Sequence, residues 1–145
     1  MVCDTGPLVA AANRRDNAHA LAAGLVTALG PDLVVLDTVA TETDTLLRRR
    51  YGDTAGRAFL ASLAGQEHTF ASLSPGLLKR AAALDLAYAD VGLGLVDGSV
   101  MAYAERHRLA ILTFDFRDFR ATESAAGPWR LLINEDDLAR GLGAQ

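Results

Sequence analysis

The sequence predicts an α/β fold with a parallel sheet that carries helices on both faces. The main observation is the order of segments, because short apolar runs typical of strands alternate with helical segments along the whole chain. The stretch Gly92–Phe119 contains one such unit, with a glycine-spaced loop, a helix opened by Asp97 and the apolar strand Leu109–Thr113. No internal repeat or linker interrupts the 145 residues. We therefore expect one domain over residues 1–145.

Composition limits the class of protein. Half of the residues are apolar and the chain is long enough for a core, so we expect an ordered protein. Cys3 is the only cysteine, which excludes an internal disulfide and indicates a reducing cytoplasm. The N-terminus lacks the features of a signal peptide, and no stretch is long enough to span a membrane. These observations predict a cytoplasmic protein that does not contact a membrane.

The formal net charge of −4 argues against a nucleic-acid binder, because such proteins usually present a basic surface. The charge is unevenly distributed, however, and a divalent metal in an acidic site would reverse the sign locally. Small arginine clusters provide candidates for phosphate contacts, although a solvated helix face also explains some of them. These candidates are Arg14, Arg15, Arg48, Arg49 and Arg117.

Caps and breaks set the limits of the elements in the first half of the chain. Thr5 can cap a short first helix. The polar run Asn13–Asn17 separates this helix from the next, and Gly30-Pro31 closes the second one. Asp37 or Thr38 can cap a third helix. The expected elements are a strand Val2–Cys3, a helix through Ala12, a helix Ala18–Leu29, a strand Leu33–Leu36 and helices Val39–Arg50 and Thr54–Ala64.

The second half of the chain continues the alternation. Ser74 starts a helix, since the proline that follows it is tolerated in a first helical turn. The Asp97 helix ends near Arg106–Arg108, and the last strand precedes a helix that opens with two acidic residues. The expected elements are a strand His68–Ala71, a helix from Ser74 to about Tyr88, the Asp97 helix, a strand Leu109–Thr113, a loop Ala121–Pro128, a strand Trp129–Ile133 and a helix Asp136–Leu142.

Two acidic residues follow predicted strands. Asp4 comes directly after the first strand, and Asp115 lies just beyond the strand Leu109–Thr113. If the two strands run parallel, both side chains reach the carboxyl edge of the sheet, where α/β proteins bind their ligands. The alternative for Asp4 is a turn or capping role, which Thr5 makes partly redundant, and the alternative for Asp115 is an ordinary loop position. We favour a functional role for both.

Two further acidic residues lie on predicted helices. Glu42 falls on or beside the apolar face of its helix, where an unpaired carboxylate is costly. It should border a cleft, bind a cation or, alternatively, pair with an arginine such as Arg50. Asp97 opens its helix, where both a helix cap and a catalytic role fit the residue. Its apolar neighbours indicate that it does not lie on an open surface. Close carboxylates repel one another unless a cation or a shared proton lies between them.

Polar neighbours of these acids are expected to support them. Thr113 lies two residues before Asp115 on the same side of an extended segment and can orient a carboxylate or a bound water, as can Ser99 from the Asp97 helix. Asp118 either joins the site or faces water, and we favour water. Oxygen ligands without paired histidines or cysteines are typical of Mg²⁺ or Mn²⁺ sites, which often assist phosphoryl chemistry.

Four motifs together resemble those of PIN-domain ribonucleases, and most of all the VapC toxins of bacterial toxin–antitoxin pairs. They cover nearly the whole chain in the right order. The motifs are DTGPLVAA at Asp4–Ala11, TVATETDTLLRRR at Thr38–Arg50, YADVGLGLVDGSVMAYAERH at Tyr88–His107 and LTFDFRDF at Leu112–Phe119. The resemblance implies a PIN-like, Rossmann-like three-layer sandwich, with a central, mostly parallel sheet flanked by helices.

The resemblance also implies a function and a set of partners. The acidic quartet of the family corresponds to Asp4, Glu42, Asp97 and Asp115, which would bind one or two Mg²⁺ or Mn²⁺ ions and activate water to cleave RNA. Thr113 matches the supporting hydroxyl residue of the family, and Asp118 falls where some members carry an extra acid. The family further implies a homodimer and a cognate VapB-type antitoxin that blocks the cleft, often with a basic side chain.

Two other functions fit parts of the pattern. A PIN-domain protein can serve RNA processing outside a toxin pair, or can be an inactive binding module with an acidic Mg²⁺ site. A phosphoacceptor receiver domain shares the fold class, but it needs a lysine at a strand end. The only lysine, Lys79, falls in a predicted helix.

Overall fold

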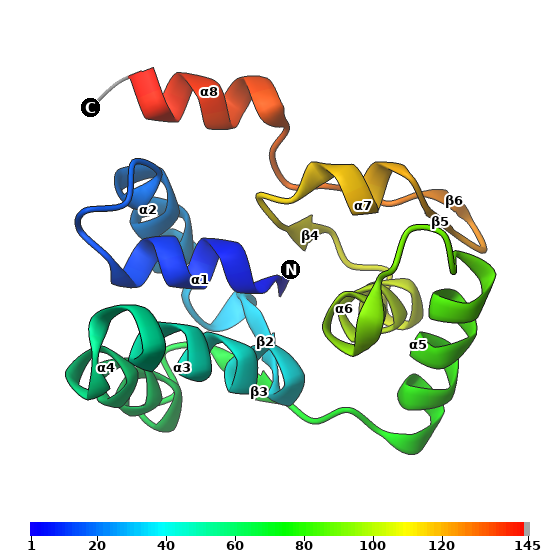
Figure 1. Cartoon of the computed structure of the whole chain (residues 1–145), viewed down its shortest axis with the longest axis horizontal. Helices are drawn as coiled ribbons and strands as arrows, with labels where there is room; N and C mark the ends of the chain where they lie inside the picture. The colour runs from blue at the N-terminus through cyan, green and yellow to red at the C-terminus, as the bar shows by residue number, and fades with distance from the viewer. Residues whose placement is uncertain (144–145) are drawn as a thin grey trace.

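Four parallel strands form a sheet in the order β3-β2-β1-β4, and helices cover both faces of it (Figure 1). The structure is a computed structural model that describes residues 1–143. The elements are β1 (Val2–Cys3), α1 (Thr5–Ala12), α2 (His19–Leu29), a 3₁₀ turn η1 (Gly30–Asp32), β2 (Val34–Leu36), α3 (Asp37–Tyr51), α4 (Asp53–Ala64), β3 (Thr69–Ala71), α5 (Pro75–Ala87), α6 (Gly94–His107), β4 (Ile111–Leu112), α7 (Phe116–Arg120), β5 (Glu123–Ser124), β6 (Gly127–Pro128) and α8 (Glu135–Gly143).

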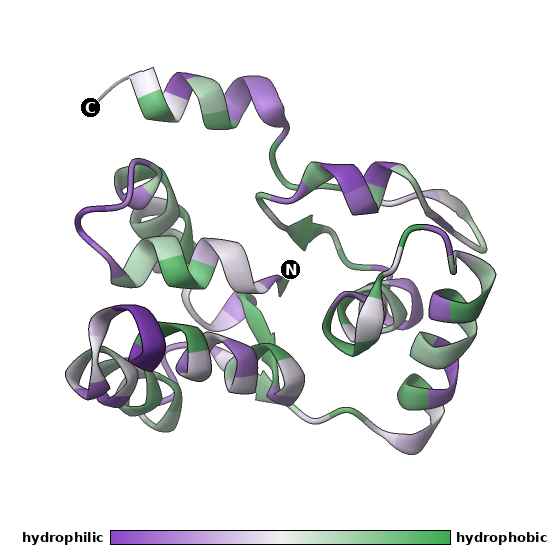
Figure 2. Cartoon of the chain, viewed as in Figure 1, coloured by the Kyte–Doolittle hydropathy of each residue, from purple (hydrophilic) through white to green (hydrophobic). Residues whose placement is uncertain are grey.

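The predicted parallel α/β class is confirmed, and β1 lies at the middle of the sheet. Val2 is in register with Val34 of β2 on one side and with Ile111 of β4 on the other. The strands are only two or three residues long. Side chains of β1, β2 and β4 are buried, as expected for parallel strands covered on both faces. Figure 2 shows β2 and β4 in hydrophobic colours at the centre of the molecule.

The helices form two outer layers. In Figure 1, α1, α3 and α4 lie to the left of the sheet, and α5 and α6 lie to its right. The pairs α1–α2, α3–α4 and α5–α6 pack against each other, and α3 also meets α6. The main core joins both layers to the sheet, and its fully buried large side chains include Leu33, Leu36, Val39, Val100, Met101, Ile111 and Leu112. No helix within residues 1–143 has the length and apolarity needed to cross a membrane.

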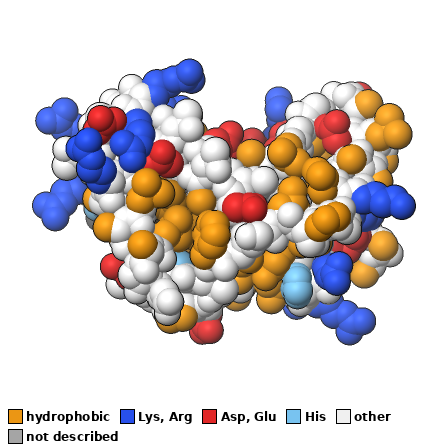
Figure 3. Space-filling view, turned by 90° about the horizontal axis from the view of Figure 1, so that it is seen from below, with side chains coloured by type: hydrophobic (Ala, Val, Ile, Leu, Met, Phe, Trp, Pro, Cys, Tyr) orange, Lys and Arg blue, Asp and Glu red, His pale blue; other side chains and the backbone are white. Residues whose placement is uncertain are grey.

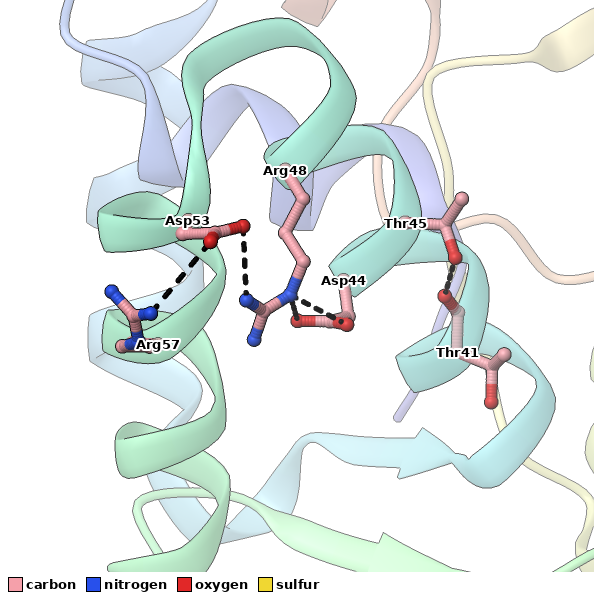
Figure 4. Close-up of polar contacts among 6 residues, drawn as sticks. All are labelled: Thr41, Asp44, Thr45, Arg48, Asp53 and Arg57. Carbon is pink, nitrogen blue, oxygen red and sulfur yellow. Dashed lines mark hydrogen bonds and ion pairs between the residues drawn. The ribbon is translucent and has the colours of Figure 1, made fainter.

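An ion-pair network joins α3 to α4 (Figure 4). The Arg48 guanidinium donates to both carboxylate oxygens of Asp44, one turn earlier, at 2.9 and 3.0 Å, and to Asp53 at 3.3 Å. Asp53 also pairs with Arg57 at 3.6 Å. Gly56 allows the close approach, because a Cβ there would lie 2.6 Å from Cγ of Arg48. Arg48 is therefore engaged within the fold, which weakens its candidacy for a phosphate contact.

The helix that carries Asp97 begins earlier than predicted. It starts at Gly94, so Asp97 is its fourth residue and not its cap. The Gly94 N–H donates to the Asp85 carboxylate at 2.9 Å, and both Gly92 and Gly94 have positive φ. A carboxylate nine residues away thus satisfies the start of the helix, and the glycines permit the turn that reaches it.

The segment after β4 also differs from the prediction. A single bridge from Leu131 to Ile111 replaces the expected strand Trp129–Ile133, since only Arg130 and Leu132 exchange backbone hydrogen bonds with Ile111. The expected loop Ala121–Pro128 contains the short antiparallel pair β5–β6. Trp129 is buried and donates its indole N–H to Thr122 Oγ1 at 3.0 Å, which ties this segment to the core instead of to the sheet edge.

Candidate active site: acidic side chains at the carboxyl edge of the sheet

Asp4 lies at the end of β1 and is buried. Asp4 itself, and not Thr5 as predicted, is the N-cap of α1, because its Oδ1 accepts from the Thr5 N–H at 2.8 Å. Its Oδ2 accepts from the Thr113 hydroxyl at 2.8 Å, across 109 residues of sequence. Burial raises the pKa of Asp4 above its ordinary value, while these two hydrogen bonds act in the opposite direction. The cap role and a place in the site therefore coexist in this residue.

Glu42 projects from α3 and is partly buried. Its Oε2 accepts a short hydrogen bond, 2.6 Å, from the Thr5 hydroxyl. Within residues 1–143 Glu42 forms no ion pair, and Arg50, the alternative partner, is exposed at the end of the helix. Thr5 thus links both acids, with its backbone on Asp4 and its hydroxyl on Glu42. The sequence predicts only a cap role for Thr5, although its position directly after Asp4 is a signal for a place in the site.

Asp97 lies in the first turn of α6 and is partly buried. Burial raises the pKa of Asp97 to about 7, and the negative charges of four other acids add to the shift. These acids are, in order of effect, Asp4, Asp118, Asp115 and Glu42. A carboxylate responds in this way only to charges that lie nearby, so β1, α3, α6 and the β4–α7 segment bring their acids to one region of the molecule.

Thr113 connects the end of β4 to the site. Besides donating to Asp4, its hydroxyl oxygen accepts from the Asp115 N–H at 3.0 Å, so one side chain joins the end of β1 to the segment after β4. Asp115 is exposed and occupies the N-cap position of α7 without making a cap hydrogen bond. Its carboxylate therefore remains available to a ligand.

Asp118 is buried, and the preference for water was wrong. The five-residue helix α7, which was not predicted, turns Asp118 inward between Phe116 and Phe119. One carboxylate oxygen accepts from Arg117 Nε at 3.0 Å, while the rest of the Arg117 side chain is exposed. Asp118 is the second-largest charge acting on Asp97, so it belongs to the same acidic region.

Ser99, which was predicted to orient an acid, does not contact one, and neither does the strand-end residue Asp37. The fully buried Ser99 bonds Thr38 Oγ1 at 2.6 Å and donates to the Val96 carbonyl at 2.8 Å, so its hydroxyl orients no carboxylate. Asp37 follows β2 as Asp4 follows β1, but its carboxylate accepts from the backbone N–H groups of Thr38 and Leu73. Asp37 is thereby used to join the loop after β3 to α3.

The donor set fits a hard divalent cation. All five side chains offer carboxylate oxygens, the ligands that Mg²⁺ and Mn²⁺ prefer. Among the described residues, Asp118 is the one acid of this set with an arginine partner, and that partner is largely solvated. Within the described part of the chain, no three acidic, histidine or cysteine side chains already surround one point as a metal site does. Within residues 1–143, the carboxylates of Asp4, Glu42, Asp97 and Asp115 therefore share a region without an ion-pair partner of their own.

The surface agrees with this arrangement. Figure 3 shows the molecule hollowed along its upper edge, between a shoulder formed over α3 and α4 and a shoulder on the side of α5. Acidic side chains lie along this hollow, and Lys or Arg side chains gather on the shoulder over α3 and α4. The hollow therefore combines an acidic floor with a basic flank.

Comparisons with known proteins agree on one family. The family model described as "PIN domain" matches residues 1–124. Ribonuclease VapC26 of Mycobacterium tuberculosis is 31% identical over 128 residues, which cover 88% of this chain and 95% of that protein. The crystal structure of M. tuberculosis VapC20, a sarcin-ricin loop cleaving toxin, superposes with a TM-score of 0.76 at 24% identity, over 90% of this chain and 97% of that one. A toxin–antitoxin complex from Klebsiella pneumoniae gives a TM-score of 0.61 at 22% identity, over 81% and 88% of the two chains.

Proposed function

Because the chain belongs to the PIN-domain family, and within it to the VapC ribonucleases, we propose that it is a metal-dependent endoribonuclease and the toxin of a toxin–antitoxin pair. The observation that supports this most is geometric: Thr113 and Thr5 hold the carboxylates of Asp4 and Glu42, and within residues 1–143 no ion pair neutralises Asp4, Glu42, Asp97 or Asp115. The raised pKa of Asp97 agrees with this crowding of negative charge. Such a site stores unfavourable charge that a bound dication removes. A structural ion-pair network would have left these acids paired.

Four residues are proposed to hold the cation: Asp4, Glu42, Asp97 and Asp115. When bound, Mg²⁺ or Mn²⁺ supplies a polarised water nucleophile and neutralises charge on the phosphodiester. Thr113 holds the Asp4 carboxylate and the Asp115 backbone in place, and Thr5 holds Glu42. Asp118 adds negative charge beside Asp97 and is a further candidate ligand. The acids come from the end of β1, from α3, from α6 and from the segment between β4 and α7. These parts of the fold must keep their spacing for all the acids to reach one ion.

RNA is the proposed substrate, and exposed arginines are its candidate phosphate contacts. Arg49 and Arg50 are exposed at the end of α3, and neither forms an ion pair among the described residues. Arg117 is 81% exposed and lies next to the buried Asp118. Cations in these places attract the backbone of a nucleic acid toward an acidic centre that would otherwise repel it.

A VapB-type antitoxin is the proposed protein partner, by similarity to the toxin–antitoxin complexes that share this fold. An acidic site without a metal would accept a lysine or arginine side chain from such a partner, because either one compensates the carboxylate charge. We place the pair in the cytoplasm, where its RNA targets lie and where the free, buried Cys3 stays reduced.

Cleavage of a structured RNA with and without divalent metal tests the enzyme. We expect cutting with Mn²⁺ or Mg²⁺, no cutting in EDTA, and a loss of about 10³-fold or more in Asp4→Asn, because a neutral amide binds a hard cation poorly. Asp136→Asn, on the exposed start of α8, serves as a control and should cut like the wild type. Gel analysis of end-labelled RNA measures cleavage by the wild type with and without metal and by both variants.

Other outcomes point away from the proposed chemistry or toward another function. Metal-independent cutting, or equal cutting by Asp4→Asn, would contradict the proposed chemistry. Metal binding without any cutting would favour an inactive binding module. Incubation with a small phosphodonor followed by intact mass would reveal a receiver domain, which is disfavoured because Lys79 lies within helix α5 and does not follow a strand.

A homodimer is proposed through the outer face of α5. Leu78 and Leu86 are 48% and 78% exposed, and the exposed Ala82 lies between them at helical spacing, which leaves an apolar stripe without cover. Leu86→Arg should weaken dimerisation at least about tenfold by placing a charge in an apolar interface. Leu60→Arg, at a 42% exposed leucine of α4, should leave it unchanged. Sedimentation equilibrium measures both, and equal effects would contradict this interface.

A further inference from the structure

One hydrogen bond joins the two helices that carry Glu42 and Asp97. Thr38 Oγ1, in the first turn of α3, lies 2.6 Å from Ser99 Oγ, in α6. Ser99 is fully buried and gives its only proton to the Val96 carbonyl at 2.8 Å. Thr38 must therefore be the donor of the shared bond. The result is an ordered chain from the Thr38 hydroxyl through the Ser99 hydroxyl to the backbone of α6.

This bond lies beside the acidic region. Thr38 is four residues before Glu42 and therefore on the same side of α3, and Ser99 is two residues after Asp97. Among the described residues, no other side-chain hydrogen bond and no ion pair runs between α3 and α6. The other hydroxyl bonds of α3 from Thr41 and Thr45 return to carbonyls of the same helix, and Figure 4 shows the bond between Thr45 and Thr41.

The two helices need such a connection. They belong to opposite layers of the fold, yet they meet near the carboxyl edge of the sheet (Figure 1). Each carries a carboxylate of the same sign, so their mutual repulsion acts to separate α3 from α6 when no cation is present. A bond made by a short, buried side chain on each helix fixes their distance with little conformational freedom.

We propose that Thr38 is a positioning residue whose hydrogen bond to Ser99 holds Glu42 and Asp97 at the separation required to share a divalent cation. The inference rests on the proposed metal site but assigns a role that none of the acids can perform. It also explains why Ser99 is buried without touching a carboxylate. Thr38 touches neither cation nor RNA and acts only through the spacing of the two helices.

Mn²⁺ binding to the full chain, measured by isothermal titration calorimetry, tests this role directly. Thr38→Val keeps the shape of the side chain and removes its donor, and we expect Mn²⁺ affinity to fall about tenfold. Thr38→Ser keeps the donor and should stay within about twofold of the wild type. Thr45→Val makes the same chemical change on the same helix, at a threonine whose bond is local, and should also stay within about twofold.

A double-mutant cycle guards against a simple loss of folding. Ser99→Ala removes the acceptor and should weaken Mn²⁺ binding as Thr38→Val does, while the double variant Thr38→Val with Ser99→Ala should be no weaker than either single variant. Additive losses would overturn the proposal, because they would mean that the two residues act separately. Equal losses in Thr38→Val and Thr45→Val would also overturn it.

The wild type separates this inference from the proposed function. If the wild type binds Mn²⁺ and cuts RNA while Thr38→Val binds Mn²⁺ equally well, only the role of Thr38 fails. If the wild type neither binds Mn²⁺ nor cuts RNA, the proposed function fails and the role of Thr38 fails with it. If Thr38→Val cuts more slowly than the wild type at saturating RNA while its KM for RNA is unchanged, Thr38 acts on the spacing of the metal ligands and not on RNA contact.

Discussion

Asp97→Asn is expected to abolish RNA cleavage and, at the same time, to make the metal-free protein more stable above neutral pH. The two effects share one cause. Asp97 is a proposed ligand, so its loss should lower the cleavage rate about 10³-fold or more. The same carboxylate is buried beside several others, and its charge is unfavourable as long as no cation is bound.

The sign of the pH effect follows from the pKa of Asp97, which is about 7 in the folded protein against an ordinary value of 3.8. Between these values the folded protein binds more protons than the unfolded chain, so stability falls as pH rises and is lowest above pH 7. The full pKa difference corresponds to about 4 kcal/mol. Asp97 is partly solvated, and screening reduces the expected loss to about 2 kcal/mol.

Urea unfolding in EDTA at pH 4 and pH 8 measures this effect. Between pH 4 and pH 8, we expect the free energy of unfolding to fall by about 2 kcal/mol more in the wild type than in Asp97→Asn. Adding Mn²⁺ at pH 8 should restore the free energy of unfolding of the wild type and leave that of the variant unchanged. The exposed Asp136→Asn controls for the loss of any one carboxylate. If Asp97→Asn and the wild type show the same dependence on pH, the acids are not close enough to interact.

Gly98→Val is expected to cause a large loss of stability. Gly98 lies where α6 crosses α5, and a Cβ there would be 3.1 Å from the Ala81 carbonyl oxygen and 3.2 Å from the Ala81 Cβ. Valine adds two more carbons and forces the helices apart, which should cost about 3 kcal/mol and lower Tm by about 10 °C. Mn²⁺ affinity should fall as well, because Asp97 and Ser99 are the neighbours of Gly98 on α6.

Gly24→Val provides a matched control for this change. Gly24 also lies inside a helix, α2, but a Cβ there would meet no atom within 4 Å. Differential scanning calorimetry should therefore show a change of at most a few degrees. Equal drops in Tm for both variants would mean that valine itself, and not the contact with Ala81, is the cause.

The sequence was sufficient for the features that depend on local pattern. The alternation of apolar strands and helices predicts the parallel sheet, and the position of Asp4 and Asp115 after strands predicts the edge to which they come. The failures involve contacts between distant residues. The start of α6 depends on Asp85, nine residues before Gly94, and no periodicity encodes that contact.

Very short helices and hydrogen bonds between distant hydroxyl side chains also could not be predicted from the sequence pattern. The five residues of α7 are too few to show a helical period, so the inward turn of Asp118 was not foreseen. The bonds from Thr5 to Glu42 and from Thr38 to Ser99 cross 37 and 61 residues. Threonine and serine are common at helix starts for local reasons, which hides the few that reach across to another helix.

The central place of β1 affects when the acidic site can form during folding. β4 pairs beside β1, and the Thr113 hydroxyl holds the Asp4 carboxylate across 109 residues of sequence. Contacts between such distant residues form slowly, because a long loop must close first. The carboxylates of Asp4 and Asp115 therefore come together only as the sheet is completed, and a partly folded chain keeps them apart.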